Sequence, residues 1–144
     1  MSKISRKRFE ERLVHLILSG GEPGLPRRLE DRRVLLTAIC LELDRRRVYS
    51  QRELDEHFTL WPYRVGGRFG LDPATIRRAL IDDGMMLRDR AGHEYRVSAD
   101  ILQGECEPTV LDIDPIECLV VERERRMVRK LQARERHSGG ETAL

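Results

Sequence analysis

The sequence predicts a mainly α-helical protein with a small β component, the α+β class. Three observations lead to this prediction. Apolar residues recur at helical spacing in several long stretches of the chain. A short helix with marked ends lies in the middle of the chain, and two extended stretches joined by a turn come directly after it. The 144 residues suffice for one domain with added segments at its ends.

The short helix spans residues 72 to 84, and both of its ends carry local signals. Asp72 can accept hydrogen bonds from the free N–H groups of the first turn, and Pro73 suits the first helical position. Gly84 can adopt the left-handed conformation that ends a helix. Both boundaries of this helix are therefore predicted from residues close to them.

The outer face of this helix carries polar and charged residues. Thr75, Arg78 and Asp82 lie opposite the apolar face, with Arg77 at its margin. The arginines can contact a nucleic acid, or they can pair with carboxylates of the same domain. Asp82 and Asp83 would repel phosphates, which favours the second interpretation.

The stretch after this helix predicts a β-hairpin. Residues 85–88 form its first strand, residues 89–92 its turn and residues 93–97 its returning strand. Arg88 and Arg90 are placed where the wing of a winged helix touches a phosphate backbone.

The other helices are predicted from apolar stripes and caps. Ser5 begins the first helix, residues 5–19, and residues 30–46 form a second helix with a broad aliphatic face. Ser50 and Glu53 have the spacing of a capping box at the start of a third helix.

The order of these elements predicts a winged helix-turn-helix core with added N-terminal and C-terminal helices. A helix, a short extended pair at Val48–Tyr49, two helices and a hairpin follow one another in that order. The core, residues 25–98, holds 15 Lys+Arg against 12 Asp+Glu, a net charge of +3. It is therefore mildly basic.

The chain divides into five predicted segments. The segment between the core and the last helix carries five acidic residues and no Lys or Arg, and we expect a short strand there, near Val110, Leu111 and Ile113. The segments are an N-terminal helix and linker (1–24), the winged-helix-like domain (25–98), an acidic connector (99–115), a C-terminal helix (116–137) and a disordered tail (138–144).

Residues 59–71 are predicted as a loop because Pro62 and several glycines interrupt the helical pattern. Aromatic residues alternate there with arginines. Such residues stack on bases, anchor a protein interface, or fold over the edge of their own core. The candidate interface residues are Trp61, Tyr63, Arg64, Arg68 and Phe69.

Signatures of catalysis, metal binding and cofactor binding are missing from the sequence. There is no phosphate-binding loop, no nucleophile elbow and no metal-ligand spacing. The three scattered cysteines, Cys40, Cys106 and Cys118, indicate a reducing compartment. No stretch approaches the roughly 20 apolar residues of a membrane span. We therefore expect a cytoplasmic protein without enzymatic activity or cofactor.

A set of landmarks between residues 25 and 97 allows comparison with a known family. They are Leu25-Pro26-Arg27-Arg28, Tyr49-Ser50 with Glu53-Leu54-Asp55, the run from Asp72 to Leu80, Asp83-Gly84, and Arg88-Asp89 with Tyr95-Arg96. Together these resemble a bacterial family called domain of unknown function 2087, over about half of the chain. The resemblance implies a winged-helix-like module that accompanies separate DNA-binding domains in transcriptional regulators. Two departures are a longer segment between the last two helices and the absence of a second helix-turn-helix in the flanks.

Two functions remain open on the sequence. The first is a DNA-binding transcriptional regulator in which the capped helix meets a groove or backbone and the hairpin adds contacts. Its nucleic-acid-binding residues are Thr75, Arg77, Arg78, Arg88 and Arg90.

The second function is a protein-interaction module without direct DNA binding. In that case Arg77 and Arg78 pair inside the domain with Glu53, Asp55 or Asp83. In either case we expect a homodimer formed through the terminal helices.

Overall fold

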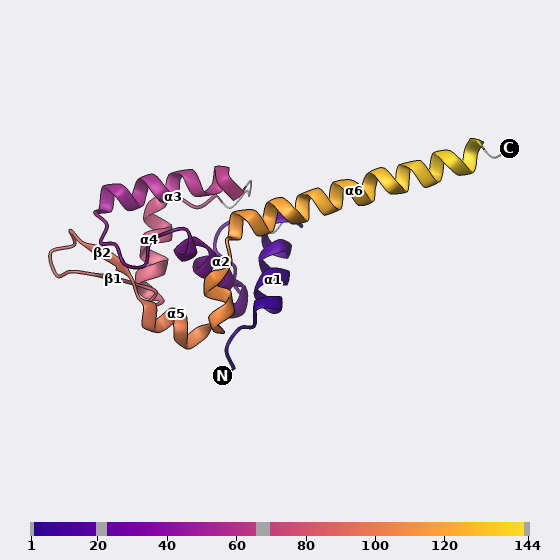
Figure 1. Cartoon of the computed structure of the whole chain (residues 1–144). Coiled ribbons are helices and arrows are strands. Elements are labelled where there is room, and N and C mark those ends of the chain that lie inside the picture. The colour runs from indigo at the N-terminus through magenta and orange to yellow at the C-terminus, as the bar shows by residue number, and fades with distance from the viewer. Residues whose placement is uncertain (1, 20–22, 66–69, 143–144) are drawn as a thin grey trace.

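Helices make up most of the structure, and the β component in the described residues is a two-stranded antiparallel sheet, as the predicted class requires. The computed structural model describes residues 2–19, 23–65 and 70–142. The body of the molecule holds every element except most of α6, which projects away from it (Figure 1). The elements are α1 (Arg6–Leu18), α2 (Leu29–Leu41), α3 (Gln51–Val65), α4 (Pro73–Asp82), β1 (Met86–Arg88), β2 (Tyr95–Val97), α5 (Ala99–Glu105), the 3₁₀ helix η1 (Pro108–Asp112) and α6 (Pro115–Thr142).

The core surrounds α2, as its broad aliphatic face predicts. Every residue from Val34 to Cys40 is buried. α1 supplies Phe9 and Leu13, and α6 supplies Leu119, all fully buried. The N-terminal and C-terminal helices are therefore part of the same core as the central helices.

Both predicted ends of α4 are confirmed. Asp72 accepts a hydrogen bond from the N–H of Thr75 at 2.7 Å. Gly84 has a φ of +74°, and the N–H of Met85 donates to the carbonyl of Leu80 at 2.9 Å. This is a Schellman motif, in which the left-handed glycine lets the chain turn back over the last carbonyls. Because Met85 and Leu80 are both buried, the motif also anchors the end of α4 in the core.

The hairpin follows α4 directly. β1 and β2 pair antiparallel, with Met86 opposite Val97. Tyr49 and Tyr95 exchange two backbone hydrogen bonds of 2.7 and 2.8 Å, so the short extended stretch before α3 lies against β2. The predicted hairpin and the predicted extended pair are therefore both present.

The prediction of a loop over residues 59–71 is wrong for its first half, because α3 continues to Val65. Pro62 lies inside the helix and costs it one backbone hydrogen bond. Burial of a continuous apolar face outweighs that cost. Leu60 is 49% exposed. The buried face consists of Leu54, Phe58, Trp61 and Val65.

The acidic connector is helical, so the strand expected in it is wrong. α5 begins at a Ser98 cap, and η1 follows it. Val110 and Ile113 are buried and lie three residues apart, which fits a helical turn rather than the two-residue alternation of a strand.

The chain before α1 pairs with this connector. Ser5 caps α1, as predicted, by accepting a hydrogen bond from the N–H of Arg8 at 3.1 Å. The N–H of Ile4 donates to the carbonyl of Glu105 at 2.8 Å, and the N–H of Glu107 donates to the carbonyl of Ile4 at 2.9 Å. These contacts hold the first residues against the end of α5.

Two helix ends differ from the prediction. α2 ends at Leu41 rather than at residue 46. The chain then turns at Asp44, whose side chain accepts a hydrogen bond from the N–H of Arg46 at 2.9 Å. α6 continues to Thr142, so residues 138–142 are helical rather than a disordered tail. Two glycines there lower helix stability without stopping the helix. Among the described residues, no helix combines the length and the apolarity needed to cross a bilayer.

Candidate nucleic-acid interface

The outer face of α4 presents the residues that the sequence singles out. Ile76 and Leu80 are fully buried and fix the rotation of the helix about its axis. Thr75 and Arg78 are exposed on the opposite face, while Arg77 is only partly exposed. The structure therefore confirms that Arg78 lies on the outer face of α4 and Arg77 at its margin.

Arg77 joins α4 to α3 through an ion pair with Asp55. The arginine side chain is 17% exposed and the aspartate 37%. Asp55 is one of the three partners that the interaction-module hypothesis names for the arginines of α4. Arg77 therefore sets the position of α4 on α3, while Arg78 makes no ion pair with any described residue.

Asp83 is neutralised by a residue that sequence reasoning did not select. Arg32, on the first turn of α2, donates two hydrogen bonds of 2.8 Å to its two carboxylate oxygens. This pairing raises the pKa of the Arg32 guanidinium and fixes the end of α4 to α2. One of the two acids expected to repel a phosphate is therefore compensated, and Asp82 remains exposed.

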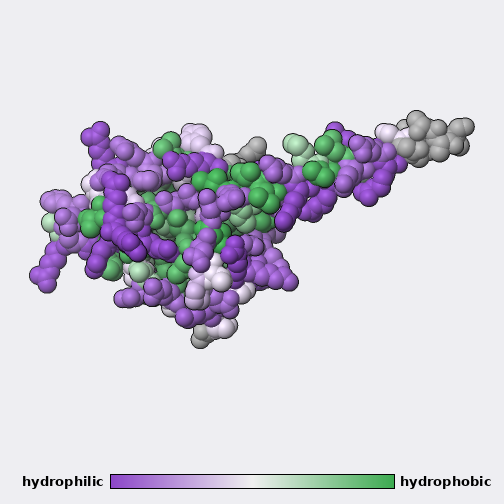
Figure 2. All heavy atoms as spheres, in the orientation of Figure 1, coloured by the Kyte–Doolittle hydropathy of each residue, from purple (hydrophilic) through white to green (hydrophobic). Residues whose placement is uncertain are grey.

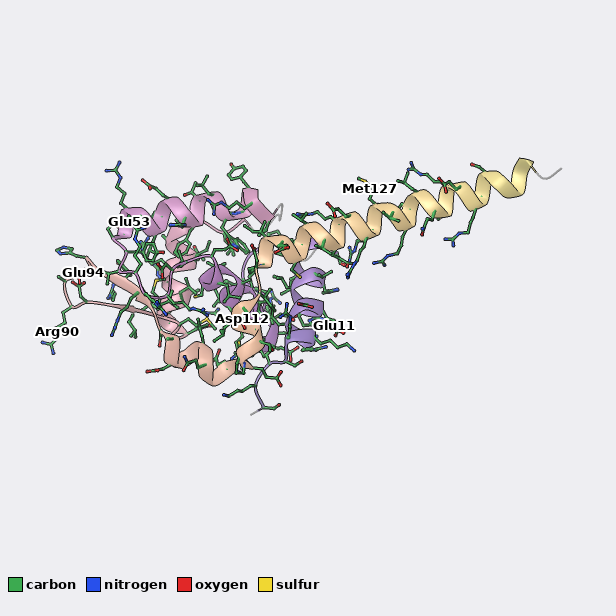
Figure 3. All side chains as sticks on the ribbon, in the orientation of Figure 1. Glu11, Glu53, Arg90, Glu94, Asp112 and Met127 are labelled. Carbon is green, nitrogen blue, oxygen red and sulfur yellow. The ribbon has the colours of Figure 1, made fainter. Side chains whose placement is uncertain are left out.

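The hairpin extends from the body with its arginines exposed. Arg88 and Arg90 are both exposed, and Figure 3 shows Arg90 at the outer end of the hairpin, pointing away from the body. Asp89 accepts hydrogen bonds from the N–H groups of Glu94 at 3.1 Å and His93 at 2.7 Å, which lower the pKa of its carboxyl group. The carboxylate of Asp89 therefore holds the turn in shape.

A hollow of about 370 Å³ lies between α4, the hairpin and the start of α3. Arg77, Arg78 and Arg88 all line it, together with Asp82 and Tyr95. Three of the five predicted nucleic-acid contacts are thus brought together, although they come from two elements. Arginine side chains that line one hollow suit contact with a phosphate group.

The other predicted contacts lie outside this hollow, and one lining residue was not predicted. Thr75 and Arg90 are exposed but are not among its lining residues. Gln51, at the first position of α3, does line it. The sequence feature that could have pointed to Gln51 is the capping box beside it, in which Ser50 and Glu53 exchange two hydrogen bonds of 3.1 Å.

The aromatic segment does not form one surface within the described residues. Trp61 is 2% exposed and belongs to the core, whereas Tyr63 is 82% exposed. Arg64 is also exposed. Arg68 and Phe69 lie outside the described residues.

A family described as an uncharacterized protein conserved in bacteria (DUF2087) matches residues 24–97 of this chain. The chain belongs to this family. No curated protein and no solved structure matches it.

The DUF2087 region begins before α2 and ends with β2. It therefore contains α4, the hairpin and every residue that lines the hollow. α1, α5 and α6 lie outside the DUF2087 region and still supply buried core residues. The candidate interface thus belongs to the part of the chain that defines the family.

Proposed function

We propose that the DUF2087 region is a winged helix-turn-helix that binds duplex DNA in a transcriptional regulator. α2, α3 and α4 follow one another with the extended stretch at Tyr49 before α3, and the hairpin comes last. This is the order of elements in a winged helix. In this assignment α4 is the recognition helix and the hairpin is the wing.

The observation that carries the proposal is the position of Arg78 and Arg88. Both are exposed, both line the hollow between α4 and the hairpin, and neither makes an ion pair within the described part of the chain. Arginines held in this way are available for forked contacts with phosphate oxygens. Arg90 extends the same positive surface to the hairpin tip, where it faces solvent.

The affinity for duplex DNA is expected to fall steeply as the salt concentration rises. Three exposed arginines, Arg78, Arg88 and Arg90, supply about three phosphate contacts, so log K against log[salt] should have a slope of about −3. Fluorescence anisotropy of a labelled mixed-sequence duplex, titrated with the full chain from 50 to 300 mM salt, measures this slope. A chain that fails to bind at 50 mM salt would refute the proposal.

A second candidate function, the binding of a protein partner, is supported by one observation about α3. Leu60 and Tyr63 are 49% and 82% exposed on its outer side, which suits contact with a protein partner. The variant Leu60→Ser/Tyr63→Ser is therefore titrated with duplex DNA in the same salt series as the wild-type chain. DNA binding through α4 is expected to be unchanged in this variant.

A further inference from the structure

α6 leaves the body and continues alone for several turns. Its first turns are held by Leu119, which is fully buried, and by Arg123, which donates to the carbonyl of Val65. From residue 127 to residue 138 every side chain is exposed. Figure 1 shows this part of the helix extending far from the other elements.

The projecting part of α6 carries apolar side chains that nothing in the described chain covers. Figure 2 shows them as green patches on the otherwise purple helix outside the body. A lone helix in water is only marginally stable, and the packing of an apolar face normally stabilises it. On the projecting part the exposed apolar side chains are Met127, Val128 and Leu131, between 50% and 65% exposed, and on the first turns Val120 and Val121 are 43% and 38% exposed.

The charges of α6 differ between its two halves. Residues 115–124 hold three glutamates and one arginine, whereas residues 125–138 hold six Lys+Arg and one glutamate. The first half is therefore acidic and the projecting half strongly basic. Two such helices placed antiparallel bring the basic half of each against the acidic half of the other.

The acidic half of α6 borders a groove of about 650 Å³ between α6 and α1. Six carboxylates and three cations line it, and its apolar lining includes Val14, Ile113 and Val121. Figure 3 places Glu11 on α1 and Asp112 on the segment before α6, while Met127 lies well beyond the body. The groove thus combines an apolar lining with a net negative charge.

We propose that the occupant of this groove is a second copy of the chain. The basic, apolar half of each α6 lies antiparallel along the acidic half of the other α6 and covers the groove beside it. An axis near residues 125 and 126 brings Val120 opposite Leu131 and Glu117 opposite Arg134. The interface is isologous, since each copy contributes the same groove and the same helix. This dimer involves no residue of the DNA-binding proposal and stands independently of it.

The mass of the full chain at tens of micromolar tests the proposal, by sedimentation or light scattering. We expect a dimer, twice the 16.8 kDa of one chain. Met127→Glu/Leu131→Glu is expected to be a monomer, because glutamates then replace apolar contacts at the interface. Leu29→Glu/Val48→Glu changes two apolar residues elsewhere that are also more than half exposed, and this variant should remain dimeric. A monomeric wild-type chain, or a dimeric Met127→Glu/Leu131→Glu chain, would overturn the proposal.

Charge reversal tests the antiparallel arrangement itself. Arg134→Glu is expected to weaken dimerisation at least tenfold, because the dimer contains the pair of Glu117 and Arg134 twice. Adding Glu117→Arg to the same chain should restore dimerisation, because each reversed charge again faces its opposite in the second copy. If the double variant dimerises no better than the single variant, the antiparallel arrangement is wrong. Far-ultraviolet circular dichroism confirms that each variant remains folded.

Discussion

Alanine at both Arg78 and Arg88 is expected to weaken the binding of duplex DNA about a hundredfold. A charge-assisted hydrogen bond contributes about 1.5 kcal/mol, which is about tenfold in affinity for each arginine. Both side chains are exposed and line the hollow between α4 and the hairpin, so their removal leaves the core intact. The slope of log K against log[salt] should also decrease by about 2 in magnitude, because two phosphate contacts are lost. Anisotropy titrations at fixed salt measure both effects.

The control for this variant removes two positive charges at another place. Lys3 and Lys7 are exposed, and Lys7 lies on α1, away from the hairpin (Figure 1). Lys3→Ala/Lys7→Ala is expected to change the affinity less than threefold through the general field of the protein. If the two variants lose the same factor in affinity for duplex DNA, net charge alone drives binding. That result would contradict the proposed interface.

Replacement of Asp31 by alanine is expected to destabilise the fold by about 3 kcal/mol. Asp31 accepts two hydrogen bonds from Arg12, at 2.8 and 2.9 Å. The side chains of Asp31 and Arg12 are 7% and 17% exposed, respectively, so the variant leaves a partly buried arginine charge without its partner. Urea denaturation measures the free energy of unfolding. Glu56→Ala, which removes a 67% exposed carboxylate 3.5 Å from Arg52, should change this free energy by less than about 0.5 kcal/mol.

The same ion pair predicts a dependence of stability on pH. Hydrogen bonds from Arg12 lower the pKa of the Asp31 carboxyl group in the folded protein. In the unfolded chain this pKa is about 3.9. The stabilisation is therefore complete above that value and disappears as the pH falls through the lower pKa of the folded state. The difference in unfolding free energy between the wild type and Asp31→Ala should be constant from pH 5 to 8 and shrink in strong acid. A constant difference down to pH 2 would contradict this assignment.

The elements that could be predicted from the sequence are those set by neighbouring residues. Asp72, Pro73 and Gly84 mark the ends of α4 within a few positions, and Ser50 with Glu53 does the same at the start of α3. α3 shows the limit of this approach. Pro62 has the local signature of a break, yet the burial of Trp61 and Val65 keeps the helix intact, and that burial depends on distant parts of the chain.

The residue types of the candidate site could be predicted from the sequence, but the ion-pair partners of these residues could not. The exposed face of α4 follows from helical spacing, and the hairpin arginines follow from the turn. Asp83 pairs with Arg32, which is 51 positions away, and Asp55 pairs with Arg77 across 22 positions. In a chain with 27 basic and 25 acidic residues, sequence spacing cannot select such pairs, because packing decides them.

The most direct test of DNA binding by α4 and the hairpin is a map of the surface that the duplex covers. Backbone amide chemical shifts of the isotope-labelled chain can be followed as a short duplex is added. The account predicts the largest changes at Thr75, Arg78, Arg88 and Arg90, with little change along residues 127–138. Changes centred on Leu60 and Tyr63, or along the projecting part of α6, would contradict it.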